Sequence, residues 1–134
     1  MSFEFSITES DGVAHLTYSG DFKDGDSLQM WSEISVKMPA LSSKKLLVEE
    51  LPGALGEVKT TELYELGKYI SENPVFSNTL IAVVFPGVIS DETLRNSIFA
   101  AKVASNRGRA VRIFQANQEA MQWLFPDSIE VVLD

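Results

Sequence analysis

Three strand-like segments separate four segments of helical periodicity along this chain, and this alternation is the strongest constraint on its fold. The clearest strand-like segment is NTLIAVVF at 78–85, which is apolar on both sides, as expected of a central strand covered on both faces. The other two are KKLLVEEL at 44–51 and AVRIFQ at 110–115. Strands alternating with helices favour a parallel sheet with right-handed crossovers. We therefore expect an α/β protein.

A hairpin precedes this alternation. FEFSI places Phe3, Phe5 and Ile7 on one face of a strand, and a second alternating run ends near Gly20. Asp11 and Gly12 stand between them, and an Asp-Gly pair between alternating runs is a strong hairpin signal. The predicted order is ββαβαβαβα, with a mixed, mostly parallel five-stranded sheet, an N-terminal antiparallel hairpin and four helices.

Capping and apolar residues mark the four helices. The predicted first residues or caps are Asp24 or Asp26, Thr60, Ser90 and Asn117, and the predicted ends include Pro39 and Gly108, the latter as a left-handed cap. The predicted apolar faces, one for each of the four helices in chain order, are Leu28, Trp31, Ile34 and Met38; Leu63, Leu66, Tyr69 and Ile70; Leu94, Ile98, Ala101 and Ser105, widened by Phe99 and Val103; and Ala120, Trp123 and Leu124.

Composition limits the class of protein. The 134 residues, 45% of them hydrophobic, are enough for one domain spanning 1–134 with its own core. Within it, 125–134 forms a tail that either adds a short edge strand or meets a neighbouring subunit. The longest apolar run is far shorter than the roughly 20 residues of a membrane span, and no signal-like segment opens the chain. The absence of cysteine fits a bacterial cytoplasmic location, which we expect.

Charge argues against nucleic acid as a partner. The formal net charge is −8, which repels phosphate backbones and anionic lipid. The glycine-containing loops match neither a Walker A loop nor GxGxxG. Acidic residues also occupy the first turns of the predicted helices, where a phosphate would bind: Glu62, Asp91, Glu92 and Glu119.

The sequence predicts no catalytic, cofactor or metal site. The single histidine, His15, lies in a strand, and local spacing assembles neither a Ser-His-Asp triad nor a metal cluster around it. Glu49 and Glu50 are adjacent and point to opposite faces of their strand. We therefore expect no enzyme and no cofactor. A polar pocket that joined His15 to two carboxylates would favour an enzyme instead.

The segment NRGRAVRIFQANQEAMQWL at 106–124, together with the order of elements, resembles the SpoIIAA-like family of STAS and related domains. Small bacterial members end with a strand finishing in Phe, a turn and a helix reading Glu-Ala-x-x-Trp-Leu, here Phe114, Glu119, Ala120, Trp123 and Leu124. The resemblance implies a (βα) superhelix that is usually not catalytic. It implies a role in regulated protein contacts or, in some relatives, in binding small apolar ligands or lipids.

The phosphorylation motif of anti-sigma antagonists in this family is missing. They carry an Asp-Ser pair at the start of the helix after the third strand, and the corresponding segment here, VEELPGALGEVKTTEL at 48–63, contains neither Asp nor Ser. Thr60 or Thr61 occupies the position of the phosphorylated residue. A Thr at a helix start is more often a cap, worth about 1 kcal/mol. The phosphorylation switch is therefore not carried over.

One basic concentration stands out in this acidic chain: Lys102, Arg107, Arg109 and Arg112. Such cations usually interact favourably with the negative end of a helix. The alternative, more specific interpretation is a docking spot for an acidic partner. Likewise, the aromatic residues Trp31, Phe99, Phe114 and Trp123 are more often core than pocket.

Two functions remain. The first is a non-enzymatic regulatory or scaffolding module that binds an unknown protein or a second copy of itself, because the chain carries more apolar helix surface than one sheet covers. The second is a carrier of a small apolar ligand such as a lipid or fatty acid, held between sheet and helices near the loops at 51–59 and 86–90. The candidate ligand or partner loop residues are Gly53, Gly56, Glu57, Thr60, Pro86 and Gly87.

Overall fold

The structure, a computed structural model, describes residues 3–23, 25–51, 60–85 and 91–126. Its strands are β1 Phe3–Ser10, β2 Val13–Gly20, β3 Lys45–Glu50, β4 Leu80–Val84 and β5 Ala110–Phe114. Its helices are α1 Asp26–Lys37, α2 Thr60–Glu72, α3 Asp91–Asn106 and α4 Asn117–Leu124, with single 3₁₀ turns at Met38–Ala40 and Pro74–Phe76.

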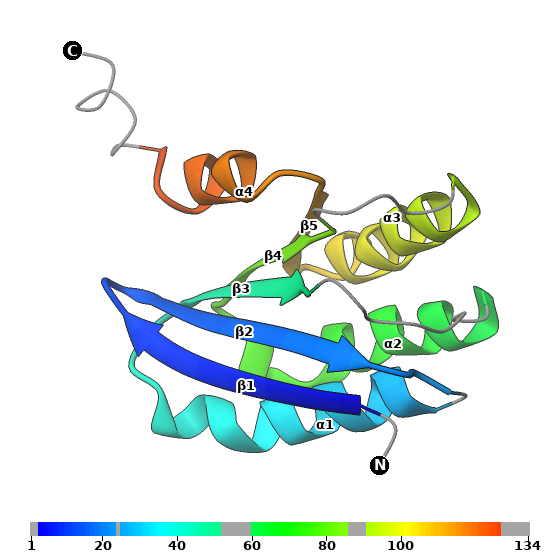
Figure 1. Cartoon of the computed structure of the whole chain (residues 1–134), viewed down its shortest axis with the longest axis horizontal. Coiled ribbons are helices and arrows are strands. Elements are labelled where there is room, and N and C mark those ends of the chain that lie inside the picture. Colours follow the sequence, from blue (N-terminus) through cyan, green and yellow to red (C-terminus); the bar gives the residue numbers. More distant parts are fainter. Residues whose placement is uncertain (1–2, 24, 52–59, 86–90, 127–134) are drawn as a thin grey trace.

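The five strands form one sheet in the order β1-β2-β3-β4-β5 (Figure 1). β1 and β2 are antiparallel, and β2, β3, β4 and β5 run parallel to one another. Asp11 and Gly12 turn the hairpin with φ angles of 51° and 83°, the positive values that a type I′ turn requires. The predicted element order and the mixed, mostly parallel sheet are confirmed.

The helices cover the two faces of the sheet unequally. α1, α2 and α3 pack on one face, where Leu16, Ile34 and Ile81 are fully buried in the main core. α4 packs alone on the other face, over β3, β4 and β5 (Figure 1). Alternate residues of the central strands therefore enter two separate cores, as the uniformly apolar 78–85 segment predicts.

The closing segment packs as its sequence predicts. Leu124 of α4 is fully buried with Ala120 beneath the second face of the sheet. The rings of Phe114 and Trp123 are half-buried against this core, with centroids 5.8 Å apart. These residues stabilise the fold by burying apolar area.

Two predictions about helix ends have different outcomes. Gly108 has a φ of 94°, and the N–H groups of Gly108 and Arg109 donate to the carbonyls of Ser105 and Ala104, so the left-handed cap of α3 is confirmed. The prediction that Asp26 caps α1 is wrong. Gly25 occupies the cap position and Asp26 is the first helical residue, where its charge still favours the positive end of the helix. Asp24, Ser90 and the side chain of Thr60 lie outside the described residues.

The buried face of α3 differs in part from the predicted one: Ala101 is buried as predicted, and Leu94 and Val103 are half-buried. Ile98 and Phe99 are 39% and 45% exposed, and Ser105 is also exposed. The side chains that face inward are small: Ser97, Ala100, Ala101 and Ala104. The reason is the close approach of α2. A Cβ atom added to Gly67 would lie only 2.5 Å from the carbonyl oxygen of Ala100.

Within the described ranges, no helix is long and apolar enough to cross a membrane. The segment 127–134, which includes most of the predicted tail strand, lies outside those ranges.

We predict that Gly67→Ala destabilises the protein. The new Cβ would also lie 3.1 Å from Cβ of Val103, so α2 and α3 must separate. Overpacking of this kind typically costs about 1–3 kcal/mol, which outweighs the roughly 1 kcal/mol that Ala gains over Gly in a helix interior. Urea denaturation should show a loss of stability, whereas Glu65→Ala, an exposed change on the same helix, should have little effect. A stabilised Gly67→Ala protein would contradict the close packing.

Candidate functional site

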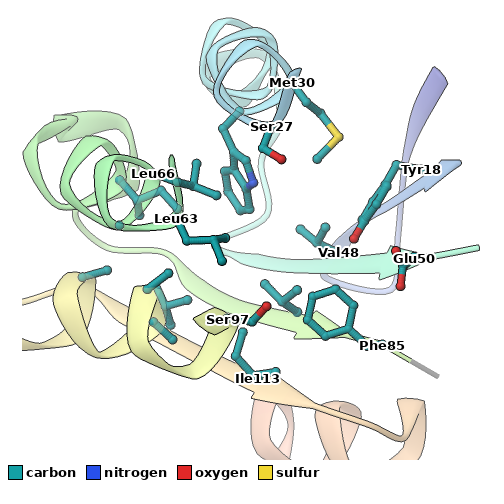
Figure 2. Close-up of a pocket in the computed structure, with 18 of the residues that line it drawn as sticks. Tyr18, Ser27, Met30, Val48, Glu50, Leu63, Leu66, Phe85, Ser97 and Ile113 are labelled. Atoms are coloured by element: carbon teal, nitrogen blue, oxygen red, sulfur yellow. The ribbon is translucent and has the colours of Figure 1, made fainter. Parts of the chain in front are cut away.

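A cavity of about 130 Å³ lies between the sheet and the helices α1, α2 and α3. One wall is formed by β2, β3, β4 and β5, mostly by their carboxyl-terminal halves, and the facing wall by residues of all three helices (Figure 2). The cavity lies where the carrier hypothesis places a ligand, because Glu50 and Phe85 in its wall directly precede the loops at 51–59 and 86–90.

The cavity exists because the residues above it are small. Gly67 of α2 and Ala100, Ala101 and Ala104 of α3 line it, and none of them has a side chain long enough to reach the sheet. The remaining walls are mostly apolar and include Met30, Trp31, Val48, Leu63, Leu66, Ile70, Val83, Phe85, Val111 and Ile113. This composition suits an apolar occupant.

One end of the cavity is polar. Tyr18 and Glu50 are register partners on the neighbouring strands β2 and β3, so their side chains lie on the same face of the sheet. Figure 2 shows them together, opposite Leu63 and Leu66. Burial raises the pKa of the Glu50 carboxyl above its usual value of 4.5. Burial, together with the negative charge of Glu50, raises the pKa of the Tyr18 hydroxyl.

The opposite face of the sheet carries a different polar group. The Nε2 atom of His15 lies 2.9 Å from Oε1 of Glu49, which also accepts a 3.1 Å hydrogen bond from the side-chain amide of Asn117. The side chains of Glu49 and Glu50 therefore lie on opposite faces of the sheet, as the alternation of side chains along a strand predicts. In the described part of the chain, His15 meets this single carboxylate, and no group of three potential metal ligands is found there.

Glu62 is a further buried acid, at the start of α2. Its Oε1 accepts a 2.8 Å hydrogen bond from the N–H of Gly25, the cap residue of α1. Its Oε2 is buried without a hydrogen-bond partner among the described residues. Since Glu62 does not line the cavity, we assign it to joining α1 and α2.

The outer surface of α2 and α3 exposes an aromatic pair. Tyr64 and Phe99 are 42% and 45% exposed, and their rings stack with centroids 6.3 Å apart. Lys68, Arg95 and Lys102 are exposed one helical turn away from these rings, where side chains three or four positions apart are neighbours. We call these five residues the α2–α3 surface.

The structure separates the four cations predicted to form a docking spot. Lys102 belongs to the α2–α3 surface. Arg109 donates hydrogen bonds to the carbonyl oxygens of Ile70 and Asn73 at the end of α2, and thus completes a helix terminus. Arg107 lies 3.8 Å from a carboxylate oxygen of Glu72.

The remaining cation, Arg112, extends over the ring of Phe114 on the α4 side of the sheet, with 5.8 Å between its guanidinium carbon and the ring centroid. The loop residues proposed for a ligand or partner, Gly53, Gly56, Glu57, Pro86 and Gly87, lie outside the described residues, and Thr60 is described only as the first residue of α2.

Sequence reasoning missed both the Tyr18–Glu50 pair and the Tyr64–Phe99 pair. Tyr18 and Glu50 meet only through the register of two strands that are far apart in the chain. Tyr64, by contrast, gave a local signal, because it lies outside the Leu63, Leu66 and Ile70 stripe of its own helix.

No family model matches this chain, and no curated protein matches it in sequence. Among solved structures, the crystal structure of an anti-sigma factor antagonist from Mycobacterium paratuberculosis is similar, with a TM-score of 0.58 and 16% sequence identity. The match covers 91% of this chain and 93% of that one. The likeness shows the fold, and it confirms the SpoIIAA-like architecture expected from the order of elements and the closing segment.

We predict that replacing Glu50 with Gln makes the protein more stable at neutral pH and changes its stability little near pH 4. A carboxyl whose folded-state pKa is raised contributes stability below its unfolded pKa, and this contribution is lost as the pH rises through the folded pKa. The free energy of unfolding of the wild type should therefore drop below that of Glu50→Gln as the pH increases above about 4.5. Urea denaturation across this range measures the difference. A stability difference of the same size at every pH would contradict the raised pKa of Glu50.

Proposed function

We propose that this protein is a non-enzymatic regulatory or scaffolding module that binds another protein through its α2–α3 surface. The observation that carries the proposal is the exposed Tyr64–Phe99 stack. Two large aromatic side chains in contact with solvent are more typical of an interface than of an inert helix face, because aromatic residues are enriched where proteins bind one another.

The charges around this stack favour an acidic partner. Lys68, Arg95 and Lys102 form no ion pair with the described residues, although the whole chain has a formal net charge of −8. Glu65 lies on the same helix as Tyr64, but successive residues of a helix point about 100° apart. Cations at the rim of an interface steer association and select a partner of opposite charge.

The fold supports a regulatory role of this kind. The similar solved structure is that of an anti-sigma factor antagonist. The segment 48–63 contains no serine and no aspartate, so we propose that binding by this chain does not depend on the Asp-Ser switch. Phosphorylation of Thr60 or Thr61 is the remaining route to such a switch.

The alternative function, a carrier of a lipid or fatty acid, has one observation in its favour, which is the apolar cavity under α2 and α3. Its volume of about 130 Å³ is well below the roughly 300–1,000 Å³ of pockets that hold drug-sized ligands. The cavity therefore suits a much smaller molecule than a fatty acyl chain, and we prefer the protein-binding function.

We predict that the double variant Tyr64→Ala/Phe99→Ala binds its partner protein much more weakly than the wild type does. Immobilised wild-type protein should retain a protein from an extract of the native cell, and the double variant should bind that protein at least about tenfold more weakly, because truncation of aromatic anchors commonly costs about 2 kcal/mol or more. Val36→Ala is the matched control, since Val36 is a 76% exposed apolar residue on α1, away from this surface. Equal retention by all three proteins would contradict the proposal.

Lys68→Glu/Lys102→Glu should weaken binding of the same protein and make this binding less dependent on salt, because only Arg95 remains as a cation of the α2–α3 surface. Light scattering of the purified protein shows whether the partner is a second copy of this chain. In that case, a wild-type dimer would become a monomer in Tyr64→Ala/Phe99→Ala but not in Val36→Ala.

A further inference from the structure

We propose that the cavity beneath α2 and α3 is a binding site for a small neutral molecule, about the size of one aromatic ring, that carries one O–H or N–H group. The proposal stands apart from the protein-binding function, because it depends on the interior of the three-helix face and not on the α2–α3 surface.

The size of the occupant follows from the volume. The cavity measures about 130 Å³. A cavity of about 150 Å³ lined by aliphatic and aromatic side chains stays dry and binds benzene. The cavity in this protein is of the same order and has the same kind of lining, with Leu63, Leu66, Ile70 and Phe85 among its walls. A single ring therefore fits.

The walls also select for a neutral molecule. Among the described residues that line the cavity, the only ionisable side chains are Tyr18 and Glu50, and none is a cation. Transfer of an unpaired charge into apolar surroundings is strongly unfavourable. A cationic group would pair with Glu50, but both ions would lose water, and the attraction within such a pair often does not offset this desolvation cost. An anionic ligand would in addition meet the Glu50 carboxyl, so carboxylic acids in their ionised form are excluded.

The hydrogen-bonding group of the ligand follows from the polar end. Neither the Glu50 carboxyl nor the Tyr18 hydroxyl forms a hydrogen bond with a described side chain, and the two lie side by side at one end of the cavity (Figure 2). Burial already raises the pKa of Glu50, which reflects incomplete solvation of its charge. A ligand O–H or N–H directed at this end would donate to the Glu50 carboxyl in place of water.

Phenol and toluene are matched probes, because they have nearly the same shape and differ in the donor. We expect both to shift backbone amide resonances of cavity residues, Gly67 and Ala100 among them, in two-dimensional NMR spectra, with saturation at millimolar concentration or below. Benzoate should cause no such shifts. Benzylamine, whose ring carries a cationic group, should bind more weakly than phenol.

Two variants test the site. Glu50→Leu removes the acceptor from a half-buried position, and it should lower the ratio of phenol affinity to toluene affinity about tenfold, the effect of losing a hydrogen bond to a carboxylate. Ala101→Leu fills the cavity and should abolish the binding of both probes. Asn106→Leu adds the same side chain at an exposed position of α3 and should leave binding unchanged.

The proposal is overturned if neither probe saturates, if the shifted amides lie away from the cavity, or if toluene binds and phenol does not. It is equally overturned if Glu50→Leu leaves the affinity ratio unchanged, or if benzylamine or benzoate binds more tightly than phenol. Since Glu50→Leu changes a half-buried side chain at the end of a strand, its result remains informative even where Ala101→Leu fails to fold. A loss of partner binding in Tyr64→Ala/Phe99→Ala with intact phenol binding would separate the two functions.

Discussion

The close packing of α2 on α3 is the contact on which both candidate sites depend. Gly67 lets the two helices approach until a single added carbon would overlap the backbone of Ala100. Since the helices meet through residues without bulk, large side chains on α3 have room only on its outer side, where Phe99 stacks on Tyr64. The same small residues leave the space above the sheet unfilled. One contact thus accounts for an aromatic pair outside and a cavity inside.

The alternation of side chains along β3 separates two polar environments that are adjacent in sequence. Glu49 enters a hydrogen-bonded group with His15 and Asn117, next to the single helix α4. Glu50 faces the cavity beneath three helices, beside Tyr18. The Glu49 carboxylate is hydrogen-bonded to described side chains, whereas the Glu50 carboxylate accepts no hydrogen bond from any described side chain. This difference, rather than the presence of an acidic residue as such, makes Glu50 the better candidate for binding a ligand.

The elements and their order were predictable because each depends on signals within a few residues. Apolar periodicity, the Asp11–Gly12 turn and the Gly108 cap are local features, and the structure has all of them. The buried face of α3 was not predictable in the same way. Hydrophobicity favours Ile98 and Phe99 as core residues, and only the approach of a second helix at Gly67 makes a stripe of alanines the inner face instead.

The cavity was even further from prediction, because its polar end requires the register of β2 against β3, which no local pattern encodes. The Tyr18–Glu50 pairing follows from the parallel alignment of strands separated by a whole helix.

The basic residues show the opposite case, in which residues close in sequence have separate partners in the structure. Arg107, Arg109 and Arg112 are close in sequence, but a helix end and a strand direct them to a carboxylate, to backbone carbonyls and to an aromatic ring. Proximity along the chain is a poor guide where the chain changes from helix to strand.

A single segment of α2 takes part in both candidate sites. Leu63 and Gly67 line the cavity, while Tyr64, between them, projects to the outer surface. A helix moves as a rigid unit over one turn, so any outward shift of α2 that enlarged the cavity would also carry Tyr64 away from Phe99. A molecule small enough to fit without such a shift would leave the aromatic stack in place. The size of the occupant therefore decides whether the interior and the surface act independently, and a volume of about 130 Å³ favours independence for a single ring.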